Sequence, residues 1–287
     1  MNLIEEAAKR LRELEQAGVK PTEPVAEAAA SARVLRPASP PPAEPTNVRH
    51  LDVARLQAAG FITPQVKESK LLHEFRIIKR PLIQNALGKG AARIPHGNLI
   101  MVTSALPGEG KTFVSLNLAM SIAMEVDCRV LLVDADVVKP SLPRVLGLQP
   151  EKGLMDVLTD PELNPKDVLL RTNIDRLSLL LAGRPHPDAS ELLASDGMSH
   201  LLQEIASRYP DRIVVFDSPP LLLTSESRIL ASRMGQVVVV VEAERTTHGT
   251  LESALATIES CPVVLTMLNK APQSEAGSYY GYYGYGR

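Results

Sequence analysis

A glycine-rich stretch within SALPGEGKT, at residues 104–112, has the composition of a phosphate-binding loop. Gly108 and Gly110 allow the backbone to wrap around an anion, so that its N–H groups point inward as donors. The ammonium group of Lys111 would reach the outer phosphates, and the hydroxyl of Thr112 would coordinate Mg²⁺. The stretch therefore predicts that the chain binds a nucleoside triphosphate together with magnesium.

The segments on either side support this interpretation. The strand-like run NLIMVT precedes the loop and a helical pattern follows it, which is the order that such a loop requires. Ala105 stands where the usual pattern has its first glycine. The alternative, a chance GEGKT in an ordinary loop, accounts for the motif but not for its flanks.

Three carboxylates follow two other apolar runs. RVLLVD ends in Asp134, with Asp136 two residues later, and RIVVFD ends in Asp217. Because the carboxyl ends of parallel strands share one crevice, these acids should face the phosphate-binding loop. They would hold hydrated Mg²⁺ or accept a proton from an acceptor hydroxyl. Each acid alone could cap a helix, but three at strand ends beside GEGKT favour the functional interpretation.

Tyrosine is concentrated at the end of the chain. Five of the six tyrosines lie in the last nine residues, and only Tyr209 lies elsewhere. A phenol has a reference pKa of about 10, so its attack on a phosphate needs a base and good positioning. The alternative is a low-complexity segment that associates with other molecules and is never modified. With the phosphate site present, we expect the phospho-acceptors to be Tyr279, Tyr280, Tyr282, Tyr283 and Tyr285.

Apolar runs of strand length alternate with amphipathic segments from about residue 66 onward. Because the runs are continuously apolar, the strands should be buried on both faces, which predicts an α/β fold with a mostly parallel sheet between helices. The predicted strands are 98–103, 129–134, 177–181, 212–217, 236–242 and 262–268. The predicted helices are 68–80, 111–125, 196–208, 225–233 and 247–260.

The whole chain is predicted to have four parts. Residues 1–17 form a short amphipathic helix, 18–65 a Pro/Ala-rich linker, 66–272 the α/β domain and 273–287 a tyrosine-rich tail without a core. The formal net charge of the 287 residues is −2, so no nucleic-acid partner is expected. Two cysteines cannot make a disulfide framework, and no apolar run reaches the roughly 18–20 residues of a membrane helix. A reducing, cytoplasmic location is therefore expected.

The ordered triplet GEGKT, VLLVDADVVKP and VVFDSPP resembles the Walker A, A′ and B motifs of the bacterial tyrosine kinases. The resemblance covers roughly residues 70–272, and the tyrosine-rich end extends it. The N-terminal segment is similar to that of the exosortase-associated subgroup of exopolysaccharide autokinases. The resemblance implies a P-loop fold of the MinD/ParA type and a protein-tyrosine kinase that uses ATP and Mg²⁺.

The resemblance also implies roles for matching residues. Asp134 corresponds to a candidate base toward the tyrosine hydroxyl, and Asp136 and Asp217 correspond to acids that support Mg²⁺ together with Thr112. Asn269, after the last predicted strand, could meet the adenine edge, although a plain turn explains it nearly as well. The expected catalytic residues are Lys111, Asp134 and Asp136, and the expected ATP-binding residues are Gly108, Glu109, Gly110, Lys111, Thr112 and Asn269.

Three positions depart from the family pattern. Val138 stands where the family often has an arginine, and Leu106 stands where the MinD-type loop has its signature lysine. The family's oligomer motif is matched only in part, by HEFRIIKR, so Arg76, Lys79 and Arg80 are candidate oligomer contacts. A solvated charged helix face explains that segment about as well.

Partners follow from the resemblance alone. It implies a homo-oligomeric ring in which each tail enters a neighbouring site, a separate membrane protein of chain-length-determinant type that holds the kinase at the membrane, and a tyrosine phosphatase. The implied process is control of exopolysaccharide synthesis or export. Two alternatives stay open: a MinD/ParA-like ATPase switch that phosphorylates no protein, and an inactive nucleotide-binding scaffold.

Overall fold

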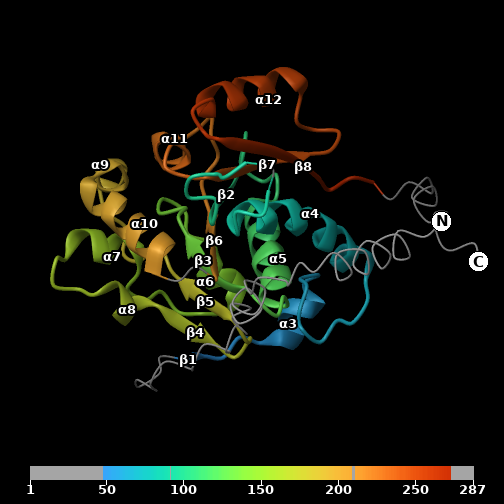
Figure 1. Cartoon of the computed structure of the whole chain (residues 1–287), viewed down its shortest axis with the longest axis horizontal. Coiled ribbons are helices and arrows are strands. Elements are labelled where there is room, and N and C mark those ends of the chain that lie inside the picture. Colours follow the sequence, from blue (N-terminus) through green and yellow to red (C-terminus); the bar gives the residue numbers. More distant parts are fainter. Residues whose placement is uncertain (1–47, 91, 209–210, 273–287) are drawn as a thin grey trace, which may run out of the picture. The chain divides into compact units, whose positions relative to one another are not determined.

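The computed structural model describes residues 48–90, 92–208 and 211–272 of the chain (Figure 1). The predicted N-terminal helix, the linker up to residue 47, Tyr209 and the tyrosine-rich tail lie outside these residues, so those expectations stay predictions. The chain divides into two units, Met1–Thr46 and Asn47–Arg287, and only the second contains described residues. Among the residues described, no helix is both long and apolar enough to span a membrane.

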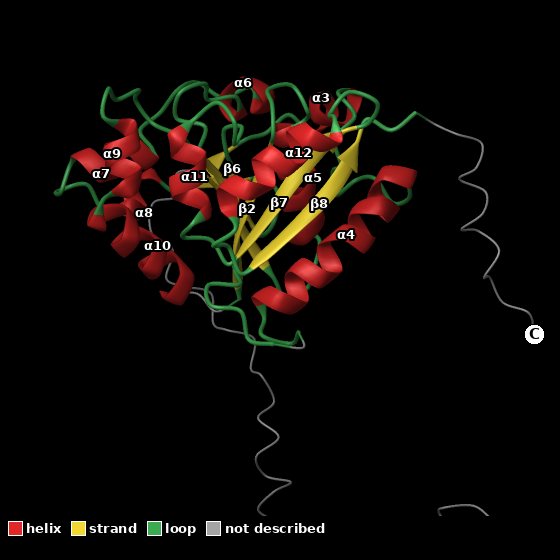
Figure 2. Ribbon diagram, turned by 90° about the horizontal axis from the view of Figure 1, so that it is seen from above, coloured by secondary structure: helices red, strands yellow, loops and turns green. Residues whose placement is uncertain are grey.

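One sheet of eight strands runs through the domain (Figure 2). The strand order is β1-β4-β5-β3-β6-β2-β7-β8, and all neighbours are parallel except β4 and β5. The strands are β1 (Val48–Arg49), β2 (Leu99–Ser104), β3 (Arg129–Asp134), β4 (Leu170–Thr172), β5 (Leu177–Leu180), β6 (Arg212–Asp217), β7 (Gln236–Glu242) and β8 (Val263–Asn269). The predicted mostly parallel α/β fold is thus confirmed, and each of the six predicted strands lies within a residue of its predicted bounds.

Helices cover both faces of the sheet, as predicted. They are α3 (Val53–Ala58), α4 (Lys70–Ala86), α5 (Lys111–Ala123), α6 (Leu142–Leu146), α7 (Leu154–Thr159), α8 (Pro165–Val168), α9 (Ala189–Ala194), α10 (Asp196–Arg208), α11 (Ser225–Ala231) and α12 (His248–Leu255), followed by the 3-10 turn η1 (Ala256–Ile258). Alternate residues of each strand enter two separate cores. In β2, Ile100 and Val102 pack on the side of α4 and α5, whereas Leu99 and Met101 pack on the side of α10 and α11.

The prediction missed two short strands, β1 and β4, and placed folded residues in the linker. Residues 48–65 were expected in the linker, but they carry β1 and α3, and their Leu51, Leu56 and Ile62 are buried in the core. The apolar residues of this segment follow neither a helical nor a strand period over more than a few residues. β1 and β4 have two and three residues, too few to give a strand signal.

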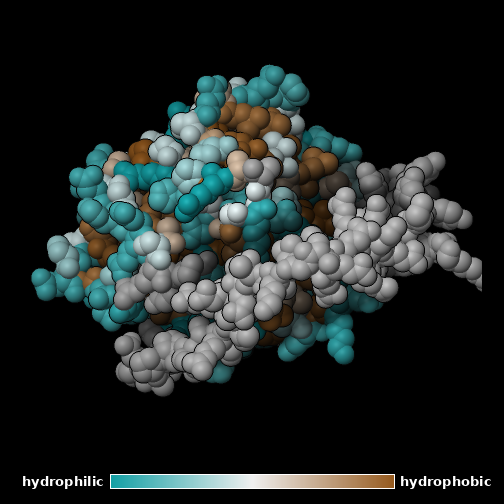
Figure 3. Space-filling model, viewed as in Figure 1, coloured by the Kyte–Doolittle hydropathy of each residue, from teal (hydrophilic) through white to brown (hydrophobic). Residues whose placement is uncertain are grey.

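The far edge of the sheet is formed by β8. Its residues alternate between half-buried and exposed, and Val264 and Leu268 are exposed. Figure 3 shows apolar side chains interrupting a largely hydrophilic surface near α12 and β8. Inside the sheet, in contrast, β2, β3 and β6 are buried almost throughout, so the positions of their carboxyl ends are firmly fixed.

Register brings the predicted acids together. Asp134 at the end of β3 lies directly beside Asp217 at the end of β6. Asp217 in turn pairs with Val102 of β2, two residues before that strand ends at Ser104. The phosphate-binding loop follows Ser104 at this same carboxyl edge, and α5 begins at Lys111. The fold thus places all three sequence motifs at the carboxyl ends of the neighbouring strands β3, β6 and β2, which we call the carboxyl edge.

Candidate active site

The GEGKT loop has the backbone conformation that its glycines predict. Gly108 and Gly110 have φ of 87° and 102°, in the left-handed region that favours glycine. A Cβ atom added to Gly110 would lie 2.1 Å from Nδ2 of Asn269, so only glycine fits there. Because α5 is 13 residues long and begins at Lys111, its N-terminal N–H groups and dipole favour an anion at the loop.

Side chains from distant strands hold the outside of the loop. Nδ2 of Asn269 donates to the Glu109 carbonyl at 2.9 Å, and Nζ of Lys270 donates to the Gly108 carbonyl at 2.7 Å. The carboxylate of Glu109 is buried, accepts from the Leu106 N–H at 2.7 Å and bonds with the hydroxyl of Thr246. We call Thr246, Asn269 and Lys270 the loop anchors. Asn269 and Lys270 hold backbone carbonyls of the loop and Thr246 holds the Glu109 carboxylate, so all three fix the loop without using its N–H groups.

Asp217 is completely buried behind the loop. Its Oδ1 accepts from the Ser115 hydroxyl at 3.1 Å, and its Oδ2 has no hydrogen-bond partner among the described residues. Burial raises the pKa of Asp217 to about 6, although the neighbouring Thr112 hydroxyl and Lys111 ammonium oppose that shift. A carboxylate with a free oxygen in a buried position is suited to a cation.

The two acids after β3 differ in exposure. Asp134 is completely buried; its Oδ2 accepts from the Leu142 N–H at 3.2 Å, and its Oδ1 has no partner among the described residues. Burial, and then the charge of Asp217, raise the pKa of Asp134 to about 8. Asp136 is only half-buried, and its Oδ1 accepts from the Lys139 N–H at 3.1 Å. Burial also raises the pKa of Asp136, while the charge of Lys111 opposes it.

The oxygen atoms of the site fit magnesium. In the described ranges no group of three or more His, Cys, Asp or Glu side chains could hold a metal ion. Free oxygens of Asp134 and Asp217 and the hydroxyl of Thr112 are hard donors of the type that Mg²⁺ prefers. The Thr112 hydroxyl lies 2.7 Å from that of Ser141, a neighbour that no sequence motif identified.

One predicted oligomer contact, Lys79, has its partners within its own domain. Lys79 is buried within the domain, where its Nζ donates to the Ser121 carbonyl at 2.5 Å and pairs with Glu125 at 2.6 Å. It therefore links α4 to the end of α5. Arg76 and Arg80 are exposed on α4, and their role in an oligomer stays a prediction.

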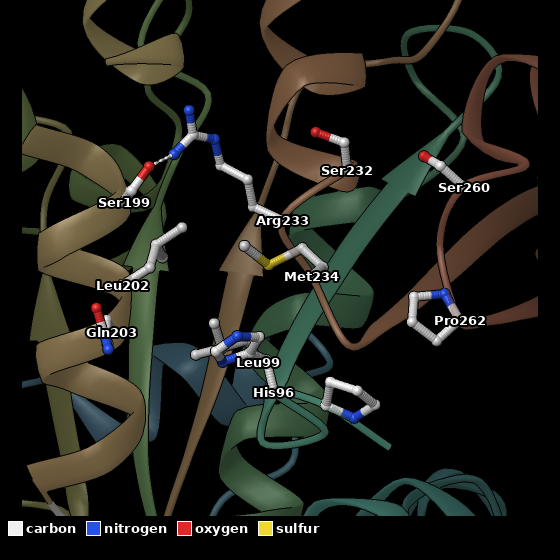
Figure 4. Close-up of a pocket in the computed structure, with 11 residues that line it drawn as sticks. His96, Leu99, Ser199, Leu202, Gln203, Ser232, Arg233, Met234, Ser260 and Pro262 are labelled. Atoms are coloured by element: carbon white, nitrogen blue, oxygen red, sulfur yellow. Dashed lines mark hydrogen bonds between the residues drawn. The ribbon is translucent and has the colours of Figure 1, made fainter. Parts of the chain in front are cut away.

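A separate hollow of about 490 Å³ lies at the amino ends of the central strands, opposite the phosphate-binding loop (Figure 4). It touches Leu99 at the start of β2 and Met234 just before β7, whereas the loop follows the end of β2. Arg233 on its wall already donates to the Ser199 hydroxyl and the Ala194 carbonyl. The hollow shares no residue with the phosphate-binding loop, so the candidate chemistry is confined to the carboxyl edge.

Comparison with known proteins agrees with this geometry. Residues 96–221, which include the loop and all three acids, match the ParA family model described as NUBPL iron-transfer P-loop NTPase. The chain is 32% identical over 186 residues to the tyrosine-protein kinase YwqD of Bacillus subtilis, covering 64% of this chain and 77% of YwqD. It is 35% identical over 194 residues to the putative tyrosine-protein kinase EpsB of Ralstonia nicotianae, covering 66% of this chain but 25% of EpsB.

A solved structure of a tyrosine kinase domain is also similar to this chain. The BceF tyrosine kinase domain is 26% identical, with a TM-score of 0.60, and the match covers 74% of this chain and 86% of that one. The chain thus spans most of the shorter relatives and about a quarter of the longer one.

Proposed function

This chain belongs to the bacterial tyrosine-protein kinase family, and from that premise we propose that it is an ATP-dependent autokinase acting on the tyrosines of its own C-terminal tail. One observation carries the proposal most directly. Two adjacent strands end in buried carboxylates that each keep a free oxygen, beside a glycine-rich loop with Lys111 and Thr112. That arrangement suits a magnesium-bound nucleotide.

The residues of the site divide the work of binding. Loop N–H groups and the Lys111 ammonium would bind the phosphates of ATP, and Asn269 would lie near the base as well as anchoring the loop. Thr112, Asp136 and Asp217 would hold magnesium, which supplies charge neutralisation on the phosphates. The positive charges also favour ionised carboxylates, which lowers the raised pKa values of Asp134 and Asp217 toward the range of a working base.

Phosphoryl transfer then needs an acceptor and a base. The phenol oxygen of a tail tyrosine attacks the γ-phosphorus, the bond from that phosphorus to the β–γ bridging oxygen breaks, and ADP leaves. The phenol proton passes to the carboxylate of Asp134, the candidate base. Asp134 is completely buried and Asp136 is half-exposed, so an acceptor meets Asp136 first.

We place the transfer between copies of the chain. The 15 residues of the tail could extend about 50 Å, which reaches its own site or that of a neighbour, so the family resemblance is the support for transfer in trans. Each phosphate adds about −1.5 to −2 charge, so a fully modified tail would be repelled from the acidic site and loosen a ring. A separate membrane activator, a phosphatase and control of exopolysaccharide synthesis belong to the same proposal.

Intact-mass analysis after incubation with Mg²⁺-ATP tests the activity. We expect up to five added phosphates, mapped to the tail, and none in Lys111→Met or when the five tail tyrosines are replaced by serine. Mixing a full-length donor that carries the five serines with a full-length Lys111→Met acceptor tests transfer in trans. Phosphate that persists in Lys111→Met alone contradicts the proposal.

The second candidate function is an ATPase switch, because the matched family model describes a P-loop NTPase and covers the phosphate-binding loop and all three acids. Its expected result is ATP hydrolysis and nucleotide-dependent association with no phosphotyrosine. The same incubation therefore separates the two candidates.

A further inference from the structure

Three exposed apolar side chains belong to the loops that carry the site. Leu106 in the phosphate-binding loop is 37% exposed, Val138 after the Asp134–Asp136 pair is 55% exposed, and Leu223 after β6 is 62% exposed. We call these three residues the apolar rim. Exposed apolar residues scattered singly are ordinary, but three on the catalytic loops of one edge need a reason.

Backbone contacts bring the rim together. The Leu221 N–H donates to the Ser104 carbonyl at 2.8 Å, and the Leu222 N–H donates to the Ala105 carbonyl at 3.3 Å. The segment leading to Leu223 therefore runs beside the segment leading to Leu106. Together they border the site from the side of β6.

Val138 belongs to the same opening. It lies within the turn in which Asp136 accepts from the Lys139 N–H at 3.1 Å. The Ala135 N–H donates to the Asp217 carbonyl at 2.8 Å, so the segment that leads to Val138 begins beside the segment that leads to Leu223. The rim therefore borders the approach to Asp136, the acid that an acceptor meets first.

The chemistry of the rim matches one segment of the chain. Residues 278–286 contain only serine, glycine and tyrosine, so they carry no charged side chain and five aromatic rings. Aromatic rings gain from contact with aliphatic side chains, while the phenol oxygen can stay in water or reach a polar group. The segment begins nine residues after Asn269, a loop anchor at the carboxyl end of β8.

We propose that the apolar rim is the docking surface for the tyrosine-rich segment 279–285, and this rests on the proposed autokinase function. A tyrosine ring packs on Leu223 and Val138 as its hydroxyl approaches Asp136. Phosphorylation adds a doubly charged group that favours water, so the modified ring leaves the rim. Leu106, Val138 and Leu223 carry no charge, so the rim favours the uncharged acceptor over its charged product.

Steady-state kinetics in trans test the proposal. The donor is the full chain with serine at the five tail tyrosines, with or without Leu223→Ser or Val138→Ser, and the acceptor is full-length Lys111→Met. We expect the KM for the acceptor to rise about five- to tenfold, with kcat and the KM for ATP changed less than about twofold. Leu223→Met keeps the apolar contact and should restore the parent KM.

Two variants give a matched control. Val126→Ser changes a side chain that is 77% exposed and lies just before β3, at the amino ends of the strands. Ile77→Ser changes a side chain on α4 that is 60% exposed. Both should leave the acceptor KM unchanged. Thermal unfolding of each donor verifies that all variants fold.

A second measurement separates the rim from the kinase activity. Fluorescence anisotropy of a labelled peptide of residues 273–287 should show binding to the serine-tailed donor, at least about fivefold weaker after Leu223→Ser or phosphorylation of the peptide. If the parent makes no phosphotyrosine, the proposed function fails. The binding measurement alone then tests whether the apolar rim binds the tyrosine-rich segment. An unchanged acceptor KM in both serine variants, or an equal rise in the KM for ATP, overturns the rim proposal.

Discussion

Two sets of buried polar groups at opposite ends of the sheet differ in how fully they are hydrogen-bonded. At the amino end of β7, the Nε2 of Gln236 donates to two backbone carbonyls at 3.1 and 2.6 Å, and its Oε1 accepts from Asn85 at 2.9 Å. At the carboxyl ends of β3 and β6, Asp134 and Asp217 are equally buried, yet each has an oxygen without a partner among the described residues.

This difference in hydrogen bonding distinguishes polar groups that stabilise the fold from polar groups that are kept for binding. A buried polar group without a partner costs about 1–3 kcal/mol, so it is retained where something else compensates. Of the five such atoms found in the described part of the chain, three belong to Asp134, Asp217 and Ser218 at the catalytic edge. Gln236 stabilises the fold it is part of, whereas the acids are arranged for a cation and nucleotide that bind later.

Asp217→Asn should give the largest change. It removes a charge that magnesium needs, so the rate of tyrosine phosphorylation should fall by about 100-fold or more, or ~2.7 kcal/mol in activation free energy. The free energy of unfolding without nucleotide should not fall, because a neutral amide avoids the cost of burying the Asp217 charge. Initial rates and urea unfolding measure the two effects. Asp175→Asn, at an exposed acid, is the control, and a stability loss without a rate loss would contradict the comparison.

Gln236→Ala should do the reverse. It leaves buried carbonyls and the Asn85 amide without their partner, so the free energy of unfolding should fall by about 1–3 kcal/mol. The phosphorylation rate per folded molecule should stay the same, because β7 begins at the edge opposite the loop. Urea unfolding followed by circular dichroism measures this change. Gln57→Ala, on an exposed side chain, should change neither quantity.

The sequence predicts the phosphate-binding loop and the acids better than it predicts the residues that hold the loop in place. GEGKT and the acids were identified because each directly follows a continuously apolar strand, and the register of β3 and β6 then confirmed their proximity. Two of the loop anchors, Thr246 and Lys270, gave no such signal, because they lie 137 and 162 residues from their partners. Lys79 looked like a surface charge, since its buried partner, the Ser121 carbonyl, is a backbone atom.

The acids should also make stability depend on pH in the metal-free protein. Asp134 has a raised pKa of about 8 in the folded state, so between about pH 5 and pH 7 the folded chain holds a proton that the unfolded chain has lost. Stability should therefore fall as pH rises, by about 1.4 kcal/mol per pH unit from this group. Asp134→Asn should flatten the slope in urea unfolding. A stability that rises with pH in this window and is unchanged in Asp134→Asn would show that the acid is not held neutral.

Lys270→Met should have the smallest effect, and it tests whether the loop anchors serve nucleotide binding or only the fold. The substitution removes the donor to the Gly108 carbonyl and the pair with Glu242 at 3.1 Å, while the backbone of β8 is unaffected. The loop then holds its N–H groups less firmly toward phosphate, so the KM for ATP should rise about three- to tenfold with kcat nearly unchanged. Lys270→Arg keeps a cationic donor and should recover part of the affinity, and Lys67→Met, at an exposed lysine, should change nothing. A lower kcat with an unchanged KM for ATP would instead place Lys270 in the transfer step. Lys270 would then belong with the catalytic residues and not with the residues that only hold the loop.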